Sequence, residues 1–367
     1  MPEHSLRFSP EDYQRLKDTY CLWWKGELSR PITPIILTDQ PASRKPSPHP
    51  PLSFATAWDF SISPEQFVDA RDWQLSRMRW EGDAFPFFGF DAFGPGVLAA
   101  FMGCTPAGQP DTVWFQPPQK DMPIESLHFE LQENSPYFRR VMSLYEAALE
   151  KWGGDVVLGM VDLGGVLDVL ASFRGSENLL MDLYDDPEEV LRCVGEIQQV
   201  WFQCYEKINA LLSPHAPGYT QWLTLFSEEP SYVLQSDFSY MISPDMFRTF
   251  AAPELSSSAA RLPHALYHMD GIGEIPHLDA LLSIEDIRAI QWVPGAGEPS
   301  RQDWSELLAR ILASGRKLLS CGPQSDAALL RAAGDNPGQV HLGDHYFRSI
   351  EDARRFGEGL GVEIQAM

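Results

Sequence analysis

The sequence predicts an α/β protein built as a (β/α)8 TIM barrel with an N-terminal helical and irregular extension. From about residue 84 onward, short apolar runs alternate with segments of helical periodicity. A repeated order of strand, loop and helix is typical of this barrel. No GxGxxG follows a strand-like run, which disfavours an open doubly wound sheet. Eight runs are expected to be strands: FPFFGFD, DVVLGMVD, GYTQWLTL, YVLQSDF, ALYHMD, IRAIQWV, KLLSC and QVHLGD.

Several of the expected helices carry start signals. After the second strand-like run, Asp186 is suited to cap a helix, with Pro187 in the first turn and Glu189 three residues after the cap. Further starts are expected at Ser243 before a proline, at Ser300 with Asp303, and at Ser349 with Asp352. In the helix that starts after Asp186, the apolar residues recur at alternating spacings of four and three, which gives one apolar face: Val190, Val194, Ile197, Trp201, Cys204, Ile208 and Leu211.

The first eighty residues differ from the rest of the chain. A polar, proline-rich stretch from Pro31 to Pro51 separates two helix-like segments. We therefore expect residues 1–80 to form an extension that packs on the main domain. The barrel itself is expected over residues 81–367.

Composition limits the function classes. The 367 residues, 44% of them hydrophobic, can bury one large core. With 28 basic and 51 acidic residues the net charge is −23, and no basic run is long enough for phosphate binding, so we expect no nucleic-acid or membrane partner. The chain lacks an apolar stretch of about 20 residues and a signal-like start, which predicts a cytoplasmic protein. The five scattered cysteines indicate reduced thiols.

In a barrel, side chains that follow the strands meet in one pocket. His268, Asp270 and Cys321 attract most attention, because each lies where a short apolar run stops and a glycine follows. The complete set of candidates at strand ends is polar and aromatic: Asp91, Asp162, Trp222, Asp237, His268, Asp270, Trp292, Cys321 and Asp344.

Three runs resemble the uroporphyrinogen decarboxylase superfamily: DLGGVLDVLASFRGSENLLMDLYDDPEEV, QSDFSYMISPDMFRTFAAPEL and HMDGIGEIPHLDALLSIEDIRAIQWVPGAG. The resemblance covers roughly residues 80 to 360. The decarboxylases carry a Pro-x-Trp-x-Met-Arg-Gln-Ala-Gly-Arg motif whose arginines hold the substrate's acetate and propionate groups. That motif does not occur here, and the nearest material, Trp73–Trp80, lacks its order and its glycine.

The chain is more similar to the cobalamin-dependent, methylcobalamin:coenzyme M methyltransferase-like branch. That branch has a zinc site of the form His-x-Cys with a distant second Cys. The resemblance places His268, Asp270 and Cys321 at these positions, with Asp270 replacing one thiolate. Zn²⁺ accepts imidazole, thiolate and carboxylate ligands and can make a nucleophile of a bound thiol or alcohol.

The implied function is a zinc-dependent methyltransferase that moves a methyl group between a corrinoid (cobalamin) carrier and a small thiol or hydroxyl acceptor. A corrinoid protein is then an expected partner. Asp162 and Asp237 are expected to orient substrate or transfer a proton, although both residues equally suit helix caps. Substrate contacts are expected from Asp91, Trp222, Tyr240 and Trp292.

Two alternatives remain open. One is a metal-free decarboxylase acting on a carboxylated ring or tetrapyrrole, with Asp91 or Asp162 stabilising a protonated intermediate. The other is a non-catalytic protein that binds a corrinoid or tetrapyrrole. Metal content distinguishes the methyltransferase from both, and ligand spectra identify the binding protein.

Overall fold

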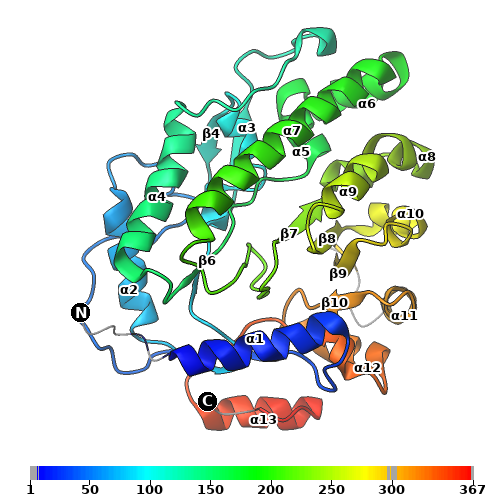
Figure 1. Cartoon of the computed structure of the whole chain (residues 1–367). Helices are drawn as coiled ribbons and strands as arrows, with labels where there is room; N and C mark the ends of the chain where they lie inside the picture. The colour runs from blue at the N-terminus through cyan, green and yellow to red at the C-terminus, as the bar shows by residue number, and fades with distance from the viewer. Residues whose placement is uncertain (1–5, 7, 296–297, 299–303, 365–367) are drawn as a thin grey trace.

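The computed structural model describes residues 6, 8–295, 298 and 304–364. Its centre is a five-stranded parallel sheet with the order β11-β10-β9-β8-β7, and helices lie around it (Figure 1). A separate parallel pair joins β3 (Phe87–Phe88) to β6 (Val157–Leu158). The strands of the central sheet are β7 (Ser231–Gln235), β8 (His264–Asp270), β9 (Ile287–Val293), β10 (Lys317–Leu319) and β11 (Val340–His341).

The predicted α/β class is confirmed, whereas a closed barrel is not detected among the described residues. Every expected strand except the third appears as a strand. The third run, residues 218–225, is irregular because Tyr219 and Ser227 exchange backbone hydrogen bonds with each other at 2.7 and 3.0 Å. Its backbone therefore turns back locally instead of extending along a neighbouring strand.

Helices follow the strands, and several begin where the sequence predicts. Pro187 opens the long helix α7, and Ser243 and Ser349 accept hydrogen bonds from the first turns of α8 and α13. The start expected at Ser300 lies outside the described residues. The helices are α3 (Leu98–Phe101), α4 (Pro136–Trp152), α5 (Val166–Arg174), α6 (Ser176–Asp185), α7 (Pro187–Leu212), α8 (Pro244–Met246), α9 (Ala252–Ala259), α10 (Leu278–Leu282), α11 (Ser305–Ala313), α12 (Pro323–Ala333) and α13 (Ile350–Leu360). None of the helices described combines the length and apolar character needed to cross a bilayer.

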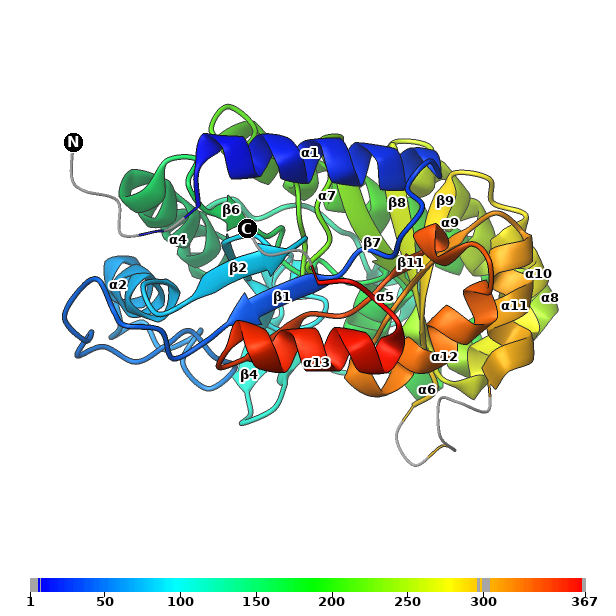
Figure 2. The same cartoon turned by 90° about the horizontal axis from the view of Figure 1, so that it is seen from below.

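The N-terminal segment contributes two strands that the sequence did not predict. The segment contains α1 (Pro10–Lys25), β1 (Pro34–Leu37), α2 (Pro64–Leu75) and β2 (Arg79–Gly82). Strand β1 lies inside the polar, proline-rich stretch from Pro31 to Pro51. It pairs parallel with β12 (His345–Phe347) and antiparallel with β2, and it runs between α1 and α13 (Figure 2). All four residues of β1 are buried, so the burial of these side chains stabilises a strand here despite the neighbouring prolines. The domain boundary near residue 80 stays a prediction.

An antiparallel hairpin was also not predicted. It joins β4 (Thr105–Gly108) to β5 (Val113–Gln116). In β5 the side chains alternate between buried and exposed, which leaves Trp114 64% exposed and Phe115 buried. The hairpin places both aromatic side chains beside the candidate site described below.

Helix α1 covers the N-terminal end of the central sheet. Trp24 stacks on His264, the first residue of β8, with ring centroids 4.0 Å apart. Tyr20 and Trp23 are fully buried in a cluster with the interior side chains of the sheet, and the Tyr20 hydroxyl is hydrogen-bonded to His341 Nε2 at 2.9 Å. The C-terminal ends of the strands are thus the ends that α1 does not cover. The members of this cluster on strands are Val157, Val233, Leu266, Ala289 and Leu319.

We expect Trp23→Ala to lower the free energy of unfolding by about 3–5 kcal/mol, because it removes a fully buried indole from this cluster. Urea unfolding followed by circular dichroism measures the change. Leu22→Ala is the matched control on the same helix, since Leu22 is 40% exposed and its loss should cost about 0.5 kcal/mol or less. Equal effects of the two substitutions would contradict the packing of α1 described here.

Candidate functional site

The register of three parallel strands brings polar side chains together at their C-terminal ends. Gln235 of β7 pairs with His268 of β8, and His268 pairs with Gln291 of β9. Asp237 lies two residues after Gln235, just beyond the end of β7, and Asp270 lies two residues after His268, at the end of β8. One ligand atom from each of Asp237, His268 and Asp270 lies within 4.8 Å of the other two. We call these three residues the acidic-histidine cluster.

The protonation of the His268 ring is set by Gln291. Gln291 Nε2 donates to the Ser320 carbonyl at 3.4 Å, which leaves its Oε1 as the acceptor for His268 Nδ1 at 2.7 Å. An amide oxygen only accepts, so Nδ1 carries the proton and Nε2 keeps its lone pair. Nε2 lies 3.9 Å from Asp270 Oδ2. Burial lowers the pKa of His268 and favours the neutral ring, which is the form that binds metals.

Trp222 fixes the other side of the imidazole. Its ring centroid lies 5.0 Å from that of His268 at an interplanar angle of 82°. The edge-to-face contact limits rotation of the histidine ring. Trp222 thus lies beside His268, while its predicted contact with a substrate stays a prediction.

Asp270 is held at the strand end by a fully buried glutamate. Glu274 Oε1 accepts from the Asp270 backbone N–H at 3.1 Å, and its Oε2 accepts from the Tyr267 hydroxyl at 2.8 Å. Gly271 permits the turn between Asp270 and Glu274, because its φ is +92° and a Cβ there would lie 2.6 Å from the Tyr240 ring. The Asp270 side chain stays 39% exposed and is available to a ligand.

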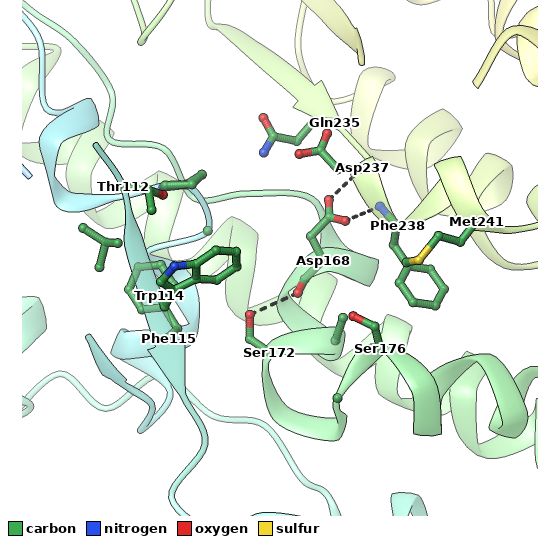
Figure 3. Close-up of a pocket in the computed structure, with 15 residues that line it drawn as sticks. Thr112, Trp114, Phe115, Asp168, Ser172, Ser176, Gln235, Asp237, Phe238 and Met241 are labelled. Atoms are coloured by element: carbon green, nitrogen blue, oxygen red, sulfur yellow. Dashed lines mark hydrogen bonds between the residues drawn. The ribbon is translucent and has the colours of Figure 1, made fainter. Parts of the chain in front are cut away.

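Asp237 is positioned by Asp168, a residue that the sequence analysis did not select. Asp168 lies in the first turn of α5, and its carboxylate accepts from the backbone N–H groups of Asp237 at 3.0 Å and Phe238 at 2.6 Å (Figure 3). These bonds tie α5 to the start of the 3-10 helix η3 (Asp237–Met241). Gly165 allows this approach, since a Cβ there would lie 2.2 Å from Asp168 Oδ2 and 2.3 Å from the Gln235 carbonyl oxygen.

A cavity of about 530 Å³ opens beside Asp168 and Asp237. In Figure 3, side chains from β5 lie on one side of Asp168 and side chains from η3 lie on the other. A small molecule of drug-like size fits such a volume, and a mostly apolar wall with a few polar groups is typical of ligand sites. The aromatic and apolar lining consists of Trp114, Phe115, Phe238 and Met241.

The carboxylates of this region carry excess negative charge. No Lys or Arg among the described residues forms an ion pair with Asp162, Asp168, Asp237 or Asp270. Burial raises the pKa of Asp162 to about 7. Burial and the charge of Asp237 raise the pKa of Asp168 to about 7. Desolvation and the charges of Asp270 and Asp162 raise the pKa of Asp237 to about 7. A bound cation would relieve this repulsion.

Cys321 does not belong to the acidic-histidine cluster. Its thiol donates to the Trp292 carbonyl at 3.1 Å, and it follows β10, two strands away from β8. Cys321 and Trp222 line a smaller cavity of about 250 Å³ together with Asp344. Metal ligation by Cys321 stays a prediction, and the structure offers Asp237 as the third partner of His268 and Asp270.

The other predicted site residues are dispersed. Asp162 is 7% exposed and accepts from the Gly164 backbone N–H at 3.0 Å, so it stabilises its own loop. Tyr240 is 48% exposed beside Gly271. Trp292 is buried, with its ring centroid 5.4 Å from that of Trp304. Asp91 lines another cavity. The roles predicted for these residues in substrate binding or proton transfer stay predictions.

Sequence signals did exist for the residues that were missed. Gln291 lies among apolar residues in the second half of β9, and a polar side chain buried in a strand requires a partner. Asp168 lies three residues after Gly165 in a first helical turn, where carboxylates bind backbone N–H groups. Trp114 gives no comparable signal, because its place beside Asp168 depends on the hairpin.

Comparison with known proteins yields one line of evidence. No family model matches the chain, and no curated protein matches it in sequence. Among solved structures it is similar to a methyltransferase from Methanosarcina mazei, with a TM-score of 0.59 and 13% sequence identity. The match covers 94% of this chain and 98% of the other. At this identity the likeness shows a shared fold across nearly the whole chain.

We expect Asp162 to make stability depend on pH. Its folded-state pKa is raised from 3.8 to about 7, so its favourable contribution is complete below about pH 4 and is lost as pH rises through 7. Asp162→Asn should remove this loss, which is about 1.4 kcal/mol per pH unit between those limits. Urea unfolding at pH 5 and pH 7 measures it.

The control for this experiment is Asp111→Asn in the turn between β4 and β5, where the residue is exposed. This variant should follow the parent at both pH values. If Asp162→Asn and the parent lost the same free energy of unfolding between pH 5 and pH 7, the Asp162 carboxyl group would not be the cause of the pH dependence.

Proposed function

We propose that the chain is a metal-dependent methyltransferase that moves a methyl group between a corrinoid carrier and a small thiol or hydroxyl acceptor. The observation that supports this most is the convergence of Asp237, His268 and Asp270 within 4.8 Å at the open ends of the parallel strands. The fold shared with a methyltransferase is consistent with the proposal. A corrinoid protein is the partner that would deliver or receive the methyl group.

We further propose that the strands form an interrupted barrel. Met160 N donates to the Thr220 carbonyl at 2.9 Å, which links the region of β6 to residues 218–225. Phe226, after that segment, packs in one cluster with Val233 and Leu266 of the central sheet. Such an arrangement would place the acidic-histidine cluster in the mouth, where barrel enzymes bind their substrates.

The cluster suits a divalent cation. One imidazole nitrogen and two carboxylate oxygens are ligands that Zn²⁺ accepts, and catalytic zinc sites use three protein ligands with one open position. The excess negative charge around Asp237 and Asp270 favours the same occupant. When bound, Zn²⁺ would lower the pKa of an acceptor thiol or hydroxyl and so make it a nucleophile.

Neighbouring residues orient the proposed ligands. Gln291 keeps the lone pair of His268 on Nε2, and Asp168 holds the backbone that carries Asp237. The apolar wall of Trp114 and Phe238 would exclude water from the transferred methyl group. Water exclusion matters because hydroxide competes with the acceptor for an activated methyl group.

Metal-stripped protein without a His tag is expected to bind one Zn²⁺ per chain in calorimetric titration. His268→Ala and Asp270→Asn should each weaken binding strongly, because each removes one of the three ligands. Gln291→Ala should weaken it about 10- to 100-fold by releasing the imidazole. His128→Ala is the matched control, since its side chain is 71% exposed.

The zinc affinities of Cys321→Ala and Asp237→Asn show which of these two residues is the third ligand. The cluster predicts that Asp237→Asn loses Zn²⁺ affinity while Cys321→Ala binds like the parent. The reverse result would favour the ligand set that the sequence resemblance implies. If parent and His268→Ala bind Zn²⁺ equally, the metal site proposed here is wrong.

The methyl-transfer reaction can be tested with methylcobalamin and a panel of thiols and alcohols. The absorbance change on demethylation should appear with the correct acceptor and disappear in His268→Ala, while the far-UV circular dichroism stays unchanged. Loss of the imidazole removes the metal and with it acceptor activation.

A carboxy-lyase is the second candidate. The raised pKa of Asp162, about 7, favours it, because a carboxyl group still protonated near neutral pH can supply the proton that replaces carbon dioxide. Release of carbon dioxide from a carboxylated ring or tetrapyrrole such as uroporphyrinogen, with methylcobalamin untouched across the panel, would establish this reaction and reject methyl transfer.

A further inference from the structure

Arg71 is a partly buried cation that makes no ion pair with a carboxylate among the described residues. It lies on α2, and Nη2 donates to the Phe87 carbonyl at 2.6 Å while Nη1 donates to Gln74 Oε1 at 3.2 Å. Its Nε is buried and has no hydrogen-bond partner among the described residues. The described part of the chain offers Arg71 no carboxylate within 4.0 Å. The two hydrogen-bond acceptors of Arg71 are neutral, and the Asp91 carboxylate acts on the guanidinium only from beyond ion-pair distance.

Two other partly buried arginines, Arg30 and Arg174, are each paired with a carboxylate. Arg30 makes two hydrogen bonds to the carboxylate of Asp83, at 2.5 and 2.8 Å. Arg174 binds Asp182 in the same two-pronged manner, at 2.6 and 3.0 Å. A guanidinium group matches a carboxylate with two parallel bonds, which is the usual solution for a partly buried arginine. Arg71 makes no such pair with a carboxylate of the described residues.

The guanidinium of Arg71 borders a cavity of about 350 Å³. Phe87 and Phe88 lie beneath the charge, with centroids 5.5 and 6.0 Å from the guanidinium carbon. Leu52 and Phe54, from the loop before α2, add further apolar surface. This cavity shares no lining residue with the one beside Asp168.

We infer that this cavity binds the carboxylate of a small organic acid at Arg71, with the apolar body of the ligand against Phe54, Phe87 and Phe88. The ligand would provide the anion that the protein does not. A single negative charge fits better than a phosphate dianion, because Asp91 also lines the cavity and would repel the second charge. The inference does not depend on the acidic-histidine cluster or on a metal.

Benzoate tests the inference, with benzamide as its neutral counterpart of equal shape. Calorimetric titration of the full chain should give saturable benzoate binding and at least tenfold weaker benzamide binding, because only the acid pairs with the guanidinium. Arg71→Met should weaken benzoate binding at least tenfold. Arg77→Met is the matched control, since Arg77 pairs with Asp39 instead.

Benzoate affinity that is unchanged in Arg71→Met, or equal to that of benzamide, would overturn the inference. Inorganic phosphate binding as tightly as benzoate would overturn the assignment of a carboxylate. If circular dichroism shows Arg71→Met to be unfolded, Arg71→Lys decides. Lysine retains the charge but loses the paired geometry, so benzoate should bind severalfold more weakly, and an unchanged affinity would reject the site.

Zinc titration of Arg71→Met, or of Arg71→Lys where the methionine variant does not fold, separates this inference from the proposed function. Arg71 does not contribute to the acidic-histidine cluster, so zinc affinity should equal that of the parent. Loss of benzoate binding with normal zinc binding supports the inference on its own. A variant that lost both would show a general defect of the fold, and the specific role of Arg71 would be rejected.

Discussion

The candidate site depends on the register between β7, β8 and β9. Side chains along a strand alternate between its two faces, so a shift of one residue would turn His268 away from Asp237 and away from Gln291. The buried strand residues on either side hold that register, because Val233, Leu266 and Ala289 must share one interior cluster. The packing of apolar side chains near one end of the sheet thus determines which polar groups meet at the other end.

Each of the three residues of the acidic-histidine cluster is held by a hydrogen bond to a second residue, which we call its anchor. Gln291 orients His268, Glu274 orients Asp270, and Asp168 orients the backbone of Asp237. Gln291 and Glu274 are buried and Asp168 is partly buried, whereas Asp270 is partly exposed and Asp237 lines the cavity. Such an arrangement lowers the conformational freedom that a ligand would otherwise have to remove on binding.

Sequence alone predicted the α/β class and most strands, because a short apolar run with polar ends can be recognised as a strand without knowledge of its distant contacts. It failed at residues 218–225, where a local pair of backbone bonds replaced a strand, and at β1, whose partner β12 lies about three hundred residues away. The sequence singled out His268, Asp270 and Asp237 as candidates because each follows an apolar run that ends a predicted strand. The grouping of Asp237 with the histidine, in place of Cys321, was not predictable, because it depends on the path of each loop beyond its strand.

The contact between Tyr20 and His341 has a consequence for synthesis of the protein. The two residues are 321 positions apart, and both lie in the interior at the covered end of the sheet. A growing chain that emerges from the ribosome can form α1 early, yet α1 cannot bury its aromatic face until nearly the whole polypeptide is available. Contacts of such high sequence separation slow folding and leave apolar surface exposed meanwhile. The aromatic face of α1 therefore stays exposed until the C-terminal strands have formed.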